Sequence, residues 1–171
     1  MIKRPQPDEY FEYYGRYIDK VPDGDICSIL ADELQTTLDL LGKVPPGRED
    51  FAYAPGKWSI KEVVGHVTDA ERVFAYRALS FARRDPAQLP SMEENDWAEI
   101  SNAAQRSLPE LADEFAAVRR SSITLFNGFD DEVSQLRGMA SGCEFSVRSI
   151  TYILAGHEMH HRGVLEERYL G

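Results

Sequence analysis

Residues 150–165 read ITYILAGHEMHHRGVL, and this stretch decides the fold class. Its apolar side chains recur at intervals of three and four residues, which is the spacing of one buried face of an α-helix. Because successive residues are turned by about 100° around a helix, His157 and His161 fall inside that apolar face, one turn apart. The pattern predicts a helix from near Ser146 almost to Gly171, with two imidazoles pointing into the protein.

Three further segments have helical spacing and recognisable start signals. The first, 25–42, is followed by a proline pair that stops a helix. The second begins at Ser59 and the third at Ser107. Glu62 and Glu110 follow these serines by three residues, as in a capping box, where each side chain binds the other residue's free amide. The sequence therefore predicts four long helices.

The remaining segments are interpreted as connections. We expect 84–102, with two prolines and an acidic patch, to be a long crossover with one irregular helical turn. The aromatic-rich segment 7–21 is expected to be a short helix that anchors the N-terminus by burying its rings. No strands are expected, because no run alternates clean apolar and polar side chains. Four helices with one long connection predict an all-α four-helix bundle, with 1–171 as a single domain.

The charge balance limits the possible partners. The 171 residues include 19 basic and 29 acidic ones, a formal net charge of -10. Such a surface repels phosphate backbones and anionic lipids, so we expect no nucleic-acid and no membrane partner. The two cysteines, Cys27 and Cys143, form no disulfide framework. With no signal peptide and no apolar run of about 20 residues, a cytoplasmic protein is expected.

The four histidines are the most informative residues of the chain. Two imidazoles at the spacing of His157 and His161 can bind one metal ion, but two nitrogens alone make a weak site. His66, on a flank of the second helix's apolar face, is the candidate third ligand. Three ligands leave a coordination position open, as in catalytic sites. His160 lies at the edge of the apolar face and is interpreted as a solvent-edge or neighbouring residue.

The string from His157 to His161 also matches H-E-x-x-H, the zinc protease signature in which the glutamate, here Glu158, is the general base. Such proteases take a third ligand downstream, and only ten residues follow His161. Glu166 and Glu167 point away from the histidine face of the helix. A zinc protease is therefore the minor alternative.

Two motifs resemble those of a known family. Residues 55–66, PGKWSIKEVVGH, are similar to the W-S-x-x-E-x-x-x-H helix start of the DinB-like superfamily, and residues 155–161, AGHEMHH, to its terminal G-H-x-x-x-H. Residues 17–22 and 145–148 are also similar to that family. The chain thus resembles the DinB_2-type metal-binding four-helix bundles over nearly its whole length.

The resemblance implies an up-down-down-up bundle with the long connection between the second and third helices, often as a homodimer. It implies a divalent metal, zinc or nickel, held by three histidines that map onto His66, His157 and His161. Characterised relatives are thiol-dependent S-transferases that use a low-molecular-weight thiol, and others are described as metal-dependent hydrolases. A small-molecule substrate is expected in either case.

The sequence leaves open which other residues act at the metal site and whether the protein is an enzyme. Glu158, Asp69 and Glu62 are the candidate catalytic carboxylates, which could orient the imidazoles through their free N–H groups. The thiol of Cys143 is interpreted as an ordinary free thiol. The alternative to an enzyme is a non-catalytic, metal-stabilised dimeric module, which an open or closed coordination position would distinguish.

Overall fold

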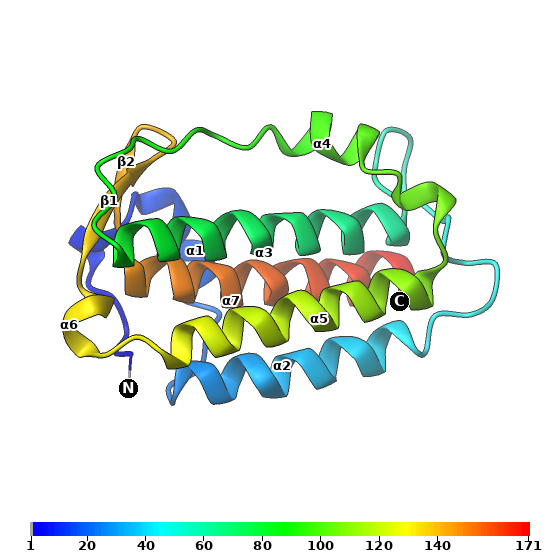
Figure 1. Cartoon of the computed structure of the whole chain (residues 1–171). Helices are drawn as coiled ribbons and strands as arrows, with labels where there is room; N and C mark the ends of the chain where they lie inside the picture. The colour runs from blue at the N-terminus through cyan, green and yellow to red at the C-terminus, as the bar shows by residue number, and fades with distance from the viewer. Residues whose placement is uncertain (1) are drawn as a thin grey trace.

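Four long helices lie side by side along most of their length (Figure 1). In the computed structural model, which describes residues 2–171, α2 and α7 run in one direction and α3 and α5 in the other. The four helices are α2 (Ile26–Leu41), α3 (Ile60–Ala82), α5 (Leu108–Asn127) and α7 (Val147–Val164). The last is continued by the π-helical turns of η4 (Leu165–Leu170). The predicted all-α, up-down-down-up four-helix bundle is confirmed.

The helix starts follow the local sequence signals. Ser59 and Glu62 form a reciprocal capping box at the start of α3, as do Ser107 and Glu110 at the start of α5. Ser146 caps α7 by accepting a hydrogen bond from the amide of Ser149. Each such cap contributes about 0.5–2 kcal/mol of stability. The capping boxes that predicted the starts of α3 and α5 are therefore confirmed.

The crossover between α3 and α5 runs along the outside of the bundle (Figure 1). Because α3 and α5 are parallel, the chain must travel the length of the bundle before α5 begins. It contains α4 (Glu94–Ile100) and the short η3 (Ala103–Gln105), more helix than the single irregular turn expected. At its start, Leu89 pairs with the segment 139–141 through two backbone hydrogen bonds.

The expectation of no strands is wrong at one place. β1 (Arg137–Ala140) and β2 (Cys143–Ser146) form an antiparallel hairpin between the short α6 (Asp131–Ser134) and α7. The residues of its two-residue turn, Ser141 and Gly142, have φ values of 52° and 74°. Both are positive, as the tight hairpin turn requires. Strands of four residues are too short to show a reliable alternating pattern.

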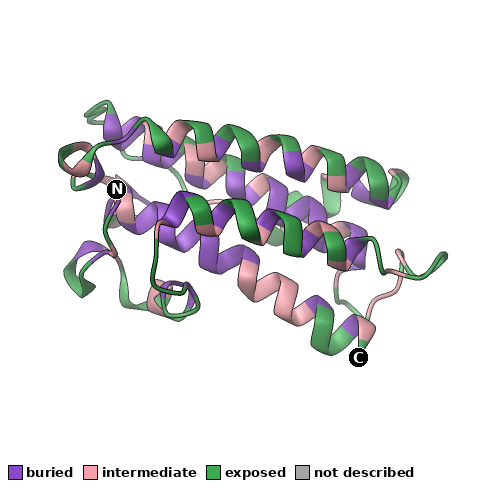
Figure 2. Ribbon diagram, turned by 90° about the horizontal axis from the view of Figure 1, so that it is seen from below, coloured by how far each residue is buried: buried purple, intermediate pink, exposed green. Residues whose placement is uncertain are grey.

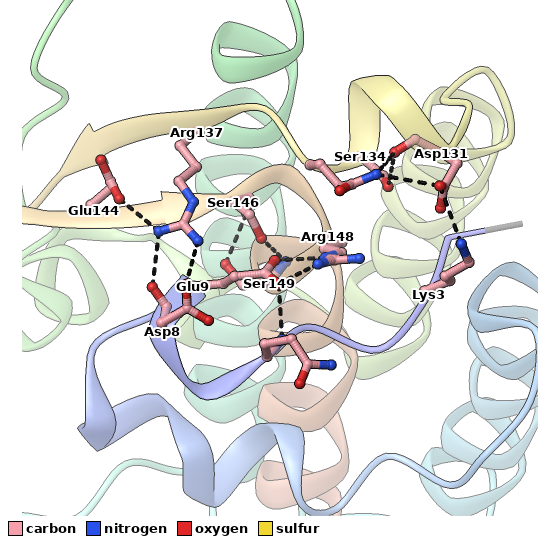
Figure 3. A network of polar contacts seen from close by, with 12 residues as sticks. Lys3, Asp8, Glu9, Asp131, Ser134, Arg137, Glu144, Ser146, Arg148 and Ser149 are labelled. Carbon is pink, nitrogen blue, oxygen red and sulfur yellow. Dashed lines mark hydrogen bonds and ion pairs between the residues drawn. The ribbon is translucent and has the colours of Figure 1, made fainter.

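The N-terminal segment forms three short turns instead of one helix. They are η1 (Pro7–Glu9), η2 (Glu12–Tyr14) and α1 (Gly15–Ile18). Polar contacts tie this segment to the hairpin and to α7 (Figure 3). Arg137 binds Asp8 and Glu144, and Arg148 of α7 forms an ion pair with the buried Glu9. Burial alone would raise the pKa of Glu9, but hydrogen bonds from Arg148 and Ser146 hold it below its ordinary value.

The core lies between the four helices, whose outer faces are exposed (Figure 2). α1 packs closely on α7, because a Cβ atom at Gly156 would lie 1.9 Å from the carbonyl oxygen of Tyr17. Only glycine permits this approach, and it brings the aromatic N-terminal segment against the histidines of α7. None of the described helices is long and apolar enough to cross a membrane.

Candidate metal centre

Three histidines from two helices converge at one point in the bundle. His157 and His161 lie one turn apart on α7, and His66 faces them from the second turn of α3. Each offers a ring nitrogen, and the three nitrogens all lie within 4.8 Å of one another. The Nε2 atoms of His66 and His157 are 3.2 Å apart. Two nitrogens that each lie about 2.0–2.1 Å from a tetrahedral zinc ion are separated by roughly 3.4 Å, so this spacing suits a shared ion.

The three imidazoles are uncharged near neutral pH. Burial lowers the pKa of His66 to about 4 and the pKa of His161 to about 3, and the charges of neighbouring histidines lower the pKa of His161 further. The pKa of His157 is also well below its usual value, again chiefly through burial. A metal ligand must be a neutral imidazole with a free lone pair. Near neutral pH the three histidines are therefore already in the form that binds a metal, and no proton has to leave before the ion binds.

Aromatic rings enclose the histidines on several sides. The ring of Trp58, two residues before the start of α3, lies 4.6 Å from that of His66. Tyr17 and Phe74 approach His157 edge-on, at 5.4 Å and 5.7 Å between ring centroids. Burial raises the pKa of Tyr17 to about 12, so this residue stays a neutral phenol. These contacts limit the access of water to the histidines and fix the planes of their rings.

The histidines open onto a cavity of about 480 Å³. This volume is in the range of small-molecule sites. His160 lines the cavity too, without belonging to the group of three, and its ring lies 5.6 Å from that of Tyr17. The polar and aromatic residues that share the lining are Tyr13, Tyr14, Arg16, Tyr17, Trp58, Phe74, Arg77, Ser91, Glu93, Glu94 and Ser141. Cys143 does not contribute to it.

The candidate carboxylates are engaged elsewhere. Glu62 binds the amide and hydroxyl of Ser59, and Asp69 pairs with Arg72 at 3.1 Å. Glu158 accepts a hydrogen bond from Thr37. Within residues 2–171, none of the three makes a hydrogen bond to a histidine ring. The structure thus brings the predicted histidines together but does not bring the predicted carboxylates to them.

Glu158 also separates this site from that of an H-E-x-x-H protease. Its side chain is only 2% exposed and borders a second, much smaller cavity of about 20 Å³, not the open one. The general base of such a protease must reach a ligand at the metal. In this bundle the third histidine comes from α3, and the glutamate of the motif faces the protein interior.

Sequence reasoning missed most of the cavity wall. The N-terminal aromatics were expected only to anchor the chain, and Tyr17 does so, but Tyr13, Tyr14 and Arg16 also line the cavity. Arg77 was missed altogether. Its position eleven residues after His66, close to three helical turns, was the available signal that the two share a face of α3.

The donor set fits a divalent metal ion. Three neutral imidazoles beside an open cavity match the three-ligand sites that leave a coordination position for water or substrate. No other histidine, cysteine, aspartate or glutamate in the described chain joins the group. The described protein thus offers a ligand set of the open type.

The fold and the three histidines define a DinB-like four-helix bundle. A model of the DinB superfamily matches residues 29–165, and the chain belongs to that superfamily, as its motifs indicated. Among solved structures it is similar to YfiT from Bacillus subtilis, described as a probable metal-dependent hydrolase with an unusual four-helix bundle topology. The two are 15% identical, with a TM-score of 0.71 over 96% of this chain and 90% of YfiT. At this identity the likeness shows the fold alone, and no curated protein matches the sequence.

Proposed function

We propose that this protein is a metal-dependent enzyme that acts on a small molecule, with His66, His157 and His161 as the metal ligands. The observation that carries the proposal is the three-histidine group at the wall of an open 480 Å³ cavity. Zinc or nickel suits the imidazole donors. A divalent metal there would lower the pKa of a coordinated water or thiol towards neutrality.

The chain's own residues prepare this site in three ways. Burial keeps the ligand imidazoles neutral, and the rings of Trp58 and Phe74 pack against His66 and His157 and hold their ring planes. Tyr17 holds its proton and accepts a hydrogen bond from Arg16. His160 borders the cavity outside the ligand group, so one of its ring nitrogens can exchange a proton with a bound small molecule.

Two reactions are compatible with such a centre. Hydrolysis is the activity named for YfiT, and transfer to a low-molecular-weight thiol is the activity that the DinB-like motifs suggest. The alternative outside enzymology is a dimeric module in which the metal only stabilises the fold. That module needs a fourth protein ligand to close the site, and the three-histidine group favours the enzyme instead.

The metal centre is tested by metal analysis of the purified protein. We expect about one divalent ion per chain in the wild type and its loss in His161→Ala. His160→Ala is the matched control, because it removes a neighbouring imidazole that lies outside the group. Saturation with metal to 100 times its dissociation constant should add about 2.7 kcal/mol to the stability. A wild-type protein that neither carries nor takes up metal refutes the proposal.

The reaction is tested on the metal-loaded protein with two probes. Metal-dependent release of nitrophenol from nitrophenyl acetate without added thiol supports hydrolysis. Consumption of small thiols in the presence of chlorodinitrobenzene, faster than without protein, supports transfer. Neither reaction above background, in a protein that binds metal through a closed fourth ligand, supports the structural module.

A further inference from the structure

The cavity extends along α3 from the histidines to the side chain of Arg77. His66 and Arg77 both line it and are eleven residues apart on one helix. At 1.5 Å per residue their Cα atoms lie about 16 Å apart along the helix axis. Phe74 lies between the two ends, since its ring is 5.7 Å from that of His157 and 6.0 Å from the guanidinium carbon of Arg77. The cavity is therefore elongated, with imidazoles at one end and a guanidinium at the other.

Arg77 is buried without a carboxylate partner. The residue is 4% exposed, and its Nη2 donates hydrogen bonds to the carbonyl oxygen of Pro90 and to the hydroxyl of Ser141. Both acceptors are neutral, and no aspartate or glutamate of residues 2–171 forms an ion pair with it. The other buried arginine of the described chain, Arg119, is paired with Glu71 at 2.8 Å. A buried charge normally has such a partner, whereas within residues 2–171 Arg77 has only neutral ones.

The hydrogen bonds of Arg77 also join the crossover to the hairpin, which is a structural role. The partners in that role, together with the Tyr14 hydroxyl beside the guanidinium, are all neutral, so they do not balance a buried positive charge. Glu93 and Glu94 line the same cavity, but both are exposed at its rim on the crossover. The charge of Glu94 acts on His66 at the other end of the cavity, but both glutamates are exposed, so solvent and salt weaken their charges more than that of the buried Arg77.

We propose that Arg77 forms an anion subsite, which binds a carboxylate of an elongated small molecule whose other end reaches the three histidines. The second half of this statement rests on the proposed metal centre, and the first half stands on Arg77 alone. The guanidinium fork can hold a carboxylate through two parallel hydrogen bonds. The substrate class is thus narrowed to molecules with an anionic group several bonds away from the group that reaches the metal.

The subsite is tested first on the metal-free protein. Binding of phenylpropionate is compared with that of phenylpropanol, which has the same shape but no charge, by NMR titration of the backbone amide signals, which the wild type and the variants share. We expect the carboxylate to bind about tenfold more tightly, the ratio typical of a charge-assisted hydrogen bond. Arg77→Gln should abolish this preference, and Arg77→Lys should retain part of it.

A control variant separates ligand binding from structure. Arg83→Gln removes an exposed arginine just after the end of the same helix and should leave the preference unchanged. Equal binding of the two probes by the wild type, or a preference that survives in folded Arg77→Gln, overturns the inference.

A second arm uses the cobalt-loaded protein and the absorption that a thiolate produces on binding cobalt. Mercaptohexanoate should bind about tenfold more tightly than mercaptohexanol, and this advantage should shrink with shorter acids that cannot span the cavity. Equal affinities of mercaptohexanoate and mercaptohexanol for the cobalt-loaded protein would contradict the anion subsite. Discrimination in the metal-free arm with no thiol binding to cobalt would instead refute the metal centre and leave the subsite standing.

Discussion

His157 and Glu158 are neighbours in the chain, yet the two faces of α7 to which they belong differ in kind. The histidine face meets an open cavity, where His157 and His161 of α7 converge with His66 of α3. Within residues 2–171 these three uncharged imidazoles make no side-chain hydrogen bond except between His66 and His157. The face with Glu158 meets a closed interior, where Arg119 is held between Glu71 and Glu158, and Thr37 donates a hydrogen bond.

This difference teaches how to separate a site from a structural network. Buried charges that face one another compensate much of each other's desolvation cost, and removing one of them affects stability. Neutral histidines that converge beside a cavity do not compensate a charge within the protein. Their arrangement therefore indicates a ligand from outside the chain. The same test distinguishes the paired Arg119 from the unpaired Arg77. The following predictions probe this contrast.

The largest expected effect on stability concerns the buried charges on the Glu158 face of α7. Arg119→Met leaves the carboxylate of Glu71 buried without its ion pair, so we expect a loss of about 3–5 kcal/mol in the free energy of unfolding. Urea denaturation measures this loss. Arg120→Met, one residue later and exposed, is the matched control and should change stability little. A loss below about 1 kcal/mol for Arg119→Met would show that the network is not a structural one.

A middle-sized effect is expected where α1 meets α7. The Cβ of Gly156→Ala would lie 1.9 Å from the Tyr17 oxygen, so α1 must move, at a cost of about 1–3 kcal/mol. The displaced tyrosines would also open the cavity wall, and small-molecule binding should weaken. Gly163→Ala, on the same helix with open space around it, should be neutral or stabilising by up to about 1 kcal/mol. Equal melting temperatures for the two variants would contradict this packing.

The smallest expected effect is on the pH dependence of the metal-free protein. The pKa values of His66 and His161 fall from 6.5 to about 4 and about 3 on folding, so the unfolded chain binds more protons below pH 6.5. Acidification from there towards pH 4 should therefore destabilise the protein. Burial raises the pKa of Glu158 from 4.5 to about 7, so its contribution is lost as the pH rises through that window.

Since these two contributions oppose each other, single variants should reveal them. Glu158→Gln should make the loss of stability on acidification steeper, and His161→Gln should make it shallower, each by at most about 1.4 kcal/mol per pH unit. Urea denaturation across this range measures both slopes. A shallower slope of unfolding free energy against pH in Glu158→Gln, or a steeper one in His161→Gln, would contradict the directions of these pKa shifts.

The sequence predicted the helices well because their signals are local. The capping boxes at Ser59 and Ser107 and the apolar spacing of α7 involve residues within one or two turns of each other. The hairpin was missed because its strands are short and are held by the backbone of Leu89, fifty residues away. The candidate carboxylates contact other residues instead of the histidine rings, because helix position alone does not say what lies opposite a side chain.

The sequence by itself determined the bundle and the pair His157 and His161, since helical periodicity fixes which side chains share a face. Only the tertiary structure decided that His66 meets this pair, that Glu158 turns to Arg119, and that Arg77 ends the cavity unpaired. These relations join residues on different helices, and the packing of the bundle sets the distances between them. A charge is structural or functional according to its neighbours, and those are assembled only when the chain folds.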